Sequence, residues 1–279
     1  MTTSSLKQCT VLRLPASGPD NEWIEEAVDV AVEAPLTIDI EGVDSYTILC
    51  SPSDRRAMAV GFLFSEGIIQ GIGDIASLAD CIDSPEMVRV RLNNPPQKNT
   101  DKPGRNLLVT SSCGMCGSTD MQEKIAALPK VSNMLRINTE VMNRAMTLLT
   151  DKQDVFKKTR GTHAILIFDG RGEAVSFAED AGRHNALDKA VGKILLVGKM
   201  AKGCGAVLSG RVSFEMVSKC SQAGIEVILA VSAPTSLAID AASLCGITLC
   251  ASVRDGGATI FTHPERINRS SKKMQKKER

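Results

Sequence analysis

Hydrophobic and polar residues alternate along much of the first hundred positions, which is the pattern of strands with one buried and one exposed face. A helix that opens at Pro52 and ends at Gly67 interrupts these strands and should bury Met58, Phe62 and Leu63. The pattern predicts a β-rich N-terminal lobe with one helix over residues 1–106. The predicted strands cover residues 29–33, 36–41, 45–50, 75–82 and 87–92.

From residue 163 onward, short apolar strands alternate with helical patterns. Such alternation is typical of an α/β fold with a mostly parallel sheet flanked by helices. A further helix, predicted over 139–157, precedes this series, and residues 268–279 form a basic tail that is expected to be disordered. The strands are expected at 163–168, 173–177, 205–208, 226–231 and 247–253, and the helices at 185–196, 213–222 and 235–244.

Several strands of this second series end in loops of small and polar residues. In an open α/β sheet, ligands bind beyond the carboxyl ends of the strands, so these loops are predicted to form one site. Unpaired N–H groups at helix starts favour anions, and Arg183, Arg211 and Arg254 could grip phosphates. Serine and threonine there can also be ordinary caps, but the loops taken together predict a phosphate-rich ligand. His184 is predicted to line this site, with a hydrogen-bonded structural histidine as the alternative.

A short strand at 107–110 should deliver a glycine-rich loop that carries Cys113 and Cys116. The Cys-x-x-Cys spacing suits a dithiol redox pair, half of a zinc site or a persulfide carrier. A four-ligand zinc site needs two further donors, and the sequence has no second Cys-x-x-Cys and no His-x-x-x-His. Gly114 and Gly117 lower the cost of unusual backbone angles, which suits a sulfur-shuttling loop better than a rigid redox motif. The residues alone leave the chemistry open.

Composition and charge exclude several classes of protein. The chain carries 33 Lys and Arg against 32 Asp and Glu, so it has no overall field to attract nucleic acid or an anionic membrane. Aromatic residues make up 3% of the chain, which argues against base-stacking platforms for single strands. The N-terminus has no apolar core of a secretory signal, so we expect a cytoplasmic protein with reduced thiols. The cysteines expected in the core are Cys9, Cys50, Cys81, Cys204, Cys220, Cys245 and Cys250.

Four short motifs make the chain resemble the formate dehydrogenase accessory sulfurtransferases. They are Ser-Cys-Gly-Met-Cys-Gly at 112–117, Asp-Ala-Gly-Arg-His-Asn-Ala-Leu-Asp-Lys at 180–189, Ser-Gly-Arg at 209–211 and Ser-Ala-Pro-Thr-Ser at 232–236. The similarity extends over most of the chain, and the Gly-Arg-His-Asn block is a specific signature. The resemblance implies a cytidine-deaminase-like domain over 107–267 and a homodimer.

The resemblance also implies a function. A cysteine desulfurase would pass persulfide sulfur to Cys113, with Cys116 as a less critical partner. The protein would then transfer the sulfur to a molybdenum or tungsten bis(molybdopterin guanine dinucleotide) cofactor, bound as substrate, before formate dehydrogenase receives it. GDP-like ligands are expected in the same pocket, and no metal site of the protein's own is expected.

The cofactor-binding residues are predicted from the strand-end loops and from the resemblance. Residues 252–257 match the family's cofactor-binding stretch, although the family usually has an aromatic residue at Ser252 and a basic or polar one near Gly257. The full predicted set is Arg183, His184, Asn185, Ser209, Gly210, Arg211, Ser232, Thr235, Ser236, Ser252, Val253, Arg254, Asp255, Gly256 and Gly257.

Two other functions fit the same sequence. A non-catalytic chaperone for formate dehydrogenase would use the α/β pocket to shield the cofactor and the cysteines only to contact the target enzyme. A dithiol oxidoreductase would require Cys116 as much as Cys113.

Overall fold

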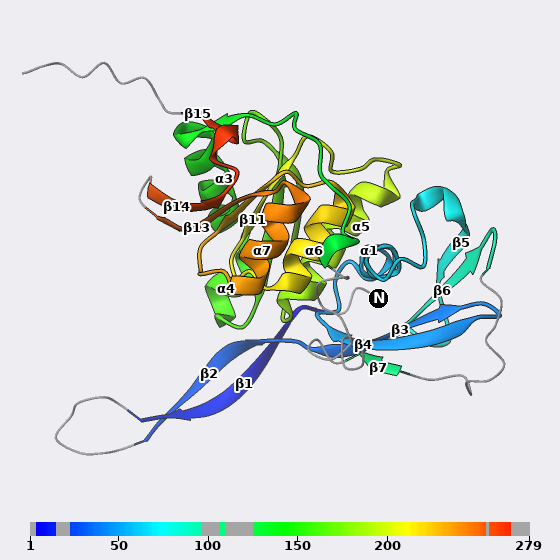
Figure 1. The fold of residues 1–279 in the computed structure, drawn as a ribbon. Helices are drawn as coiled ribbons and strands as arrows, with labels where there is room; N and C mark the ends of the chain where they lie inside the picture. The colour runs from blue at the N-terminus through cyan, green and yellow to red at the C-terminus, as the bar shows by residue number, and fades with distance from the viewer. Residues whose placement is uncertain (1–3, 15–22, 96–106, 110–124, 255–256, 269–279) are drawn as a thin grey trace, which may run out of the picture. The chain divides into compact units, whose positions relative to one another are not determined.

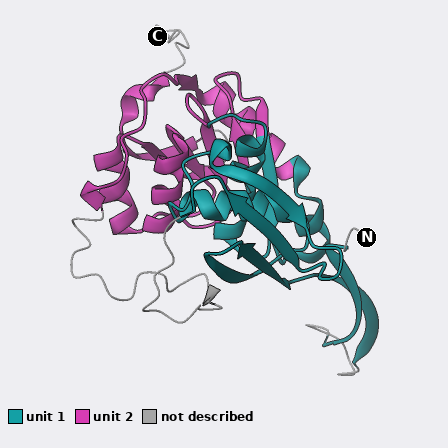
Figure 2. Cartoon of the chain, turned by 90° about the vertical axis from the view of Figure 1, so that its right-hand side faces the viewer, with its two compact units in different colours: residues 1–121, 151–165, 176–200 teal, residues 122–150, 166–175, 201–279 magenta. Residues whose placement is uncertain are grey.

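The computed structural model describes residues 4–14, 23–95, 107–109, 125–254 and 257–268. The chain divides into two compact units, shown in Figure 2. Unit 1 holds residues 1–121, 151–165 and 176–200, and unit 2 holds residues 122–150, 166–175 and 201–279. Neither unit is a continuous stretch of sequence, because the chain passes between them several times.

A five-stranded sheet forms the N-terminal part of unit 1 (Figure 1). Strand β3 pairs antiparallel with β4 and parallel with β6, while β7 pairs parallel with β4. Leu36, Ile38 and Ile40 of β3 are buried, which is the period of two expected of a strand with one covered face. The predicted β-rich lobe is therefore confirmed. In spatial order its strands are β5 (Ile75–Asp80), β6 (Met87–Leu92), β3 (Ala34–Ile40), β4 (Asp44–Cys50) and β7 (Leu107–Val109).

The helix predicted after the third strand is α1 (Arg55–Ser65), and it packs against α5 (Arg183–Leu196) at very short range. Gly61 of α1 and Gly192 of α5 each face the backbone of the other helix. A Cβ atom added to either glycine would lie 1.9 Å from a carbonyl oxygen of the neighbouring helix. The absence of a side chain at these two positions therefore sets the distance between α1 and α5.

A two-stranded antiparallel ribbon, β1 (Leu6–Arg13) with β2 (Ile24–Ala31), belongs to the same unit (Figure 1). Strand β2 packs on the short helix α4 (Asp154–Thr159). Leu12 and Trp23, at the other end of the ribbon, are 62% and 61% exposed. Strand β1 is not predicted from the sequence, and the strand expected over 29–33 overlaps only the end of β2, because the pattern of an exposed ribbon does not separate a buried face from a solvated one.

A six-stranded sheet has the order β10-β9-β11-β12-β13-β14. Strands β11, β12 and β13 are parallel neighbours, and helices α6 (Phe214–Ala223) and α7 (Ser236–Cys245) connect them. This architecture confirms the predicted α/β class. The strands are β9 (His163–Phe168), β10 (Ala174–Asp180), β11 (Gly205–Leu208), β12 (Val227–Ala230), β13 (Thr248–Arg254) and β14 (Gly257–Thr262).

Two predicted boundaries are wrong. The single helix expected over 139–157 is two helices, α3 (Thr139–Lys152) and α4, because the chain turns at Gln153. The carboxylate of Glu179 accepts hydrogen bonds from the first backbone N–H groups of α4 and so starts a new helix there. The strand expected over 247–253 is followed by one that is not predicted, β14, which pairs antiparallel with β13 at the sheet edge.

The remaining described elements are short. β8 (Ile137–Asn138) pairs parallel with β15 (Ile267–Asn268), and the 3-10 turns are η1 (Ile72–Asp74) and η2 (Pro264–Arg266). Across the described residues, no helix combines the length and the apolar character that a membrane crossing requires.

Candidate functional site

Three predicted site residues, Arg183, His184 and Asn185, form the first turn of α5, directly after β10 in unit 1. The helix begins at Arg183, two residues before the predicted start at 185. Its N-cap is Gly182, whose lack of a side chain means that no cap hydrogen bond forms from that residue. The first N–H groups of a helix carry a partial positive charge, so this turn is suited to an anion.

Asp180 holds this turn through hydrogen bonds, and its carboxylate is fully buried. Oδ1 accepts hydrogen bonds from the backbone N–H of Gly182 at 2.8 Å and from the side-chain amide of Asn185 at 3.1 Å. The same amide nitrogen of Asn185 also donates to the carbonyl oxygen of Leu49 at 2.8 Å. Asn185 therefore points its amide into the protein and ties the turn to β4.

A buried ion pair completes the arrangement. Lys189 and Asp180 are both 0% exposed, and the Lys189 Nζ atom lies 2.5 Å from Asp180 Oδ2. Lys189 also donates to the carbonyl oxygen of Ser51 at 2.7 Å, so its charge is held by two oxygens. Removing one partner of such a pair leaves an uncompensated buried charge, which typically costs about 3–5 kcal/mol. The pair therefore fixes the geometry of the polar motif at 180–189.

Arg183 differs from these inward-facing residues. Its side chain is half-buried, and its Nε atom is a buried donor that has no hydrogen-bond partner among the described protein atoms. An unsatisfied buried donor is uncommon in proteins and is the kind of group that a bound acceptor would complete. Arg183 therefore fits a role in binding a phosphate oxygen.

His163, at the start of β9, lies within electrostatic range of this turn. Burial lowers the pKa of His163, and the Coulombic effects of Arg183 and His184 lower it further, against the opposing effect of Asp180. His163 is not predicted to be a site residue, because the sequence around it carries no polar cluster like the one that flanks His184. Its proximity to Arg183 comes from the pairing of β9 with β10 and cannot be read from spacing.

The remaining predicted site residues belong to unit 2 and follow the parallel strands. Ser209, Gly210 and Arg211 follow β11, and Ser232 lies two residues after Ala230, the last residue of β12. An isolated bridge between Val212 and Pro234, with hydrogen bonds from Val212 N–H and Thr235 N–H, holds these two loops side by side. The predicted convergence of the loops after β11 and β12 therefore occurs in the structure.

Helix α7 begins just after the second of these loops. Thr235 is its N-cap, and the Thr235 hydroxyl accepts a hydrogen bond from the backbone N–H of Ala238 at 3.3 Å. Arg211, Thr235 and Ser236 are exposed. Thr235 thus has the ordinary role of a threonine at a helix start, that of a cap, and its hydroxyl lies at an exposed helix start.

Ser252 occupies an unusual position near the end of β13. Its φ angle is 54°, in the left-handed region that non-glycine residues rarely adopt, and the register of β13 with β14 shifts there. Bulges of this kind re-aim side chains and are common beside functional sites. Ser252 is exposed, Val253 is buried and Gly257 opens β14. Asp255 and Gly256 lie outside the described residues, as does the side chain of Arg254.

Cys113 and Cys116 lie outside the described residues, between β7 and Ile125. Five of the seven other cysteines are buried, and Cys9 and Cys81 are half-buried. Burial raises the pKa of Cys220 and of Cys250 to about 12, so these thiols stay protonated at neutral pH. Burial also raises the pKa of Cys50, Cys204 and Cys245, so all five buried cysteines are poor nucleophiles at neutral pH.

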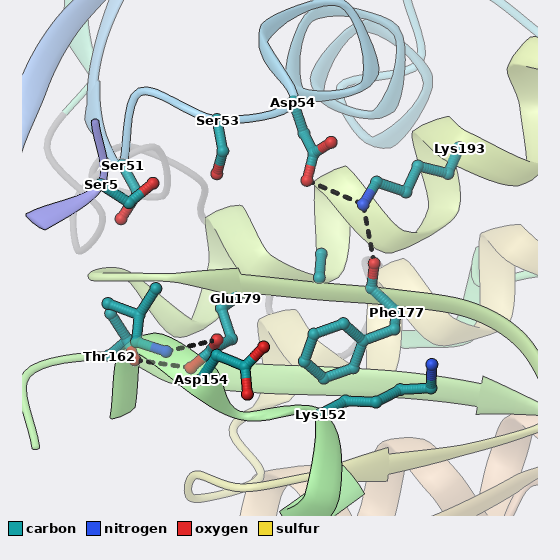
Figure 3. A pocket seen from close by; sticks show the side chains of 12 residues that line it. Ser5, Ser51, Ser53, Asp54, Lys152, Asp154, Thr162, Phe177, Glu179 and Lys193 are labelled. Atoms are coloured by element: carbon teal, nitrogen blue, oxygen red, sulfur yellow. Dashed lines mark hydrogen bonds and ion pairs between the residues drawn. The ribbon is translucent and has the colours of Figure 1, made fainter. Parts of the chain in front are cut away.

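A cavity of about 270 Å³ lies in unit 1, lined by the loop that precedes α1, by β10 and by α4 (Figure 3). Two of its charged groups, Lys193 and Asp54, pair with one another. Lys193 Nζ lies 2.7 Å from Asp54 Oδ2 and 2.9 Å from the carbonyl oxygen of Phe177, while Glu179 caps α4. None of the described predicted site residues lines this cavity, and its acidic residues (Asp54, Asp154 and Glu179) outnumber its basic ones (Lys152 and Lys193), which does not favour an anion. No cluster of three metal-ligating side chains occurs among the described residues.

Comparisons with known proteins place this geometry in a family. Residues 31–268 match the model of the FdhD/NarQ family. The chain is 38% identical to "Sulfur carrier protein FdhD" of Thermoplasma acidophilum, over 88% of this chain and 89% of that protein. It is also 38% identical to the protein of the same name from Saccharolobus solfataricus, over 89% of this chain and 94% of that one.

A solved structure shows the same fold. The crystal structure of a formate dehydrogenase accessory protein from Desulfotalea psychrophila superposes with a TM-score of 0.75 at 22% identity, covering 95% of this chain and 100% of that one. The match to the family model covers well over half of the chain, and the relatives named sulfur carriers are aligned over most of their length. The chain therefore belongs to the FdhD/NarQ family.

Proposed function

We propose that this protein is a sulfur carrier that serves formate dehydrogenase. It takes persulfide sulfur from a cysteine desulfurase on Cys113 and delivers it to a molybdenum or tungsten bis(molybdopterin guanine dinucleotide) cofactor. The observation that carries the proposal is the family match, which spans both the Cys113-x-x-Cys116 motif and the strand-end loops. The relatives that the chain resembles over most of its length are themselves named sulfur carrier proteins.

The loading step requires a thiolate. The Cys113 thiolate attacks the outer sulfur of the desulfurase persulfide, the donor's sulfur–sulfur bond breaks, and the desulfurase cysteine leaves as a thiolate. Cys113 then carries one additional sulfur atom. The high pKa of the buried thiols supports this assignment indirectly, because thiols such as Cys220 cannot compete as nucleophiles at neutral pH.

The cofactor is held through its nucleotides in this proposal. Guanine dinucleotides present phosphates, and two separate elements suit a phosphate: the first turn of α5 with Arg183 in unit 1, and the exposed start of α7 with Arg211 nearby in unit 2. Because Arg183 has a buried Nε donor without a described partner, a phosphate oxygen would satisfy it. Binding of this kind depends on local groups and needs no net charge on the protein as a whole.

Intact-mass analysis tests the carrier chemistry. The purified protein is incubated with an active cysteine desulfurase and cysteine, with and without thiol reductant. We expect a reducible gain of one sulfur, about 32 Da, that maps to Cys113. Cys113→Ala should abolish the gain, while Cys116→Ala should retain it.

Cys81→Ala is the matched control, because Cys81 is a half-buried cysteine distant in sequence from the motif. It should load as well as the wild-type chain. Loading that persists in Cys113→Ala would refute the assignment of the carrier residue. If the wild-type chain gains no sulfur, while Cys113→Ala still supports maturation of formate dehydrogenase, the protein is a chaperone that shields the cofactor.

A further inference from the structure

Ser51, which follows β4, makes an unusual set of contacts with the polar motif at 180–189. Its backbone N–H donates to Asp180 Oδ2 at 2.9 Å, and its carbonyl oxygen accepts from Lys189 Nζ at 2.7 Å. Its hydroxyl accepts from the backbone N–H of Ala181 at 3.1 Å. Ser51 is 3% exposed. All three polar groups of this one buried residue therefore bind a single segment about 130 positions further along the chain.

These contacts act where α5 cannot secure its own start. The N-cap, Gly182, provides no side-chain acceptor, so the path of the chain into the helix depends on groups outside the helix. Asp180 holds the N–H of Gly182, and the Ser51 hydroxyl holds the N–H of Ala181. Consecutive N–H groups that lead into Arg183 are thus fixed by two different residues, one of them from another part of unit 1.

We propose that Ser51 is a positioning residue for the anion-binding turn at the start of α5. Its hydroxyl holds the backbone at Ala181, and this sets the direction in which Arg183 and the first N–H groups of the helix face a nucleotide phosphate. The inference rests on the proposed function, because it takes the α5 turn to be a nucleotide-binding element. Ser51 itself does not touch the ligand in this scheme.

A second serine whose hydroxyl contacts the motif at 180–189 offers a matched control. Ser65, at the end of α1, donates from its hydroxyl to Asp188 Oδ1 at 2.6 Å. Ser51→Ala and Ser65→Ala therefore delete the same chemical group, and each removes one hydrogen bond to the motif at 180–189. They differ in where the bond acts, because Asp188 lies within α5, more than a turn beyond Arg183, whereas Ala181 lies in the chain that enters the helix. A merely structural role would affect both variants alike.

The experiment is a titration of the full-length chain with GDP by isothermal calorimetry, with the melting temperature of each variant measured in parallel. We expect Ser51→Ala to weaken GDP binding about fivefold, the equivalent of one hydrogen bond, and Ser65→Ala to leave it within about twofold at a comparable loss of thermal stability. Ser51→Thr keeps the hydroxyl and should restore the wild-type affinity.

The possible failures are distinguishable. If the wild-type chain binds GDP and Ser51→Ala binds it equally well, the positioning role is wrong and the nucleotide site stands. Equal weakening by Ser51→Ala and Ser65→Ala, or no recovery in Ser51→Thr, also overturns the role, because the effect is then one of general stability. If the wild-type chain does not bind GDP at all, both the nucleotide site and this inference are wrong, whereas sulfur loading on Cys113 is decided separately by mass.

Discussion

The close packing of α1 on α5 leads to a sharp prediction for Gly192→Ala. The new Cβ atom would lie 1.9 Å from the carbonyl oxygen of Ala57, 2.7 Å from its carbonyl carbon and 2.9 Å from the backbone nitrogen of Gly61. All three atoms belong to backbone, so no side-chain rotation relieves the clash. Ordinary contact begins at 3.4 Å, so α1 would have to move by about 1.5 Å.

Two opposing effects decide the magnitude. Alanine is favoured over glycine inside a helix by about 1 kcal/mol, which offsets part of the damage. Overpacking a close-packed contact costs about 1–3 kcal/mol, and more where only backbone can yield. We expect Gly192→Ala to lower the free energy of unfolding by about 2 kcal/mol, which corresponds to roughly 4–8 °C in melting temperature for a chain of this size.

Urea unfolding followed by circular dichroism measures this effect, with Gly73→Ala as the control. Gly73 has no heavy atom within 4 Å of the position of an added Cβ, and its φ angle is not in the left-handed region. The control should therefore be as stable as the wild-type chain. If Gly192→Ala unfolds at the same urea concentration as Gly73→Ala, the two helices are not held at the distance described, and the reasoning from glycine contacts is wrong.

Two further predictions concern buried ionisable groups. Glu226 is buried and accepts hydrogen bonds from Ser132 and from two backbone N–H groups, and Arg266 lies 3.4 Å away. Burial alone raises the pKa of Glu226, but these hydrogen bonds and the charge of Arg266 outweigh burial and lower the pKa below its usual value. Its contribution to stability is present above the ordinary glutamate pKa and is lost as pH falls through the folded-state value. Glu226→Gln should therefore be less stable than wild type by about 3 kcal/mol at pH 7, and urea unfolding should show this difference shrinking below about pH 4, whereas a constant difference would contradict the prediction. For Cys220, burial raises the pKa to about 12, so its contribution to the free energy of unfolding is intact below about pH 8.5 and falls as pH rises. Between pH 8 and 10, the free energy of unfolding of Cys220→Ala should fall by about 2 kcal/mol less than that of the wild type in the same assay. Equal falls in the two proteins would refute the prediction.

Regular elements with one buried face could be predicted from the sequence. Strand β6 and helix α1 lie close to their expected positions, because apolar periodicity and the turn residues that flank them agree. The ends of α3 and α4 could not be predicted. The break at Gln153 depends on Glu179, which reaches the first N–H groups of α4 from a strand about 25 residues further along the chain. A cap supplied by tertiary contact leaves no local signal in the sequence.

The candidate site shows the same division. The loops after β11 and β12 could be foreseen as neighbours, because the carboxyl ends of adjacent parallel strands must lie at one edge of a sheet. The contributions of Ser51 and His163 could not be foreseen. Ser51 follows an N-terminal strand and is brought to the 180–189 motif by the packing of α1 on α5, while His163 approaches Arg183 only through strand pairing.

The motif at 180–189 shows why a specific sequence signature is not by itself a list of ligand-binding residues. Asp180, Asn185 and Lys189 direct their polar atoms at one another and at the backbone of β4 and its following loop. Each would leave a buried polar group unsatisfied if replaced, so packing alone requires these residue types at this spacing. Arg183 has no such internal requirement for its Nε donor. Within this signature, we therefore expect Arg183 and the backbone of the first turn to contact the proposed nucleotide, whereas Asp180, Asn185 and Lys189 hold that turn in place.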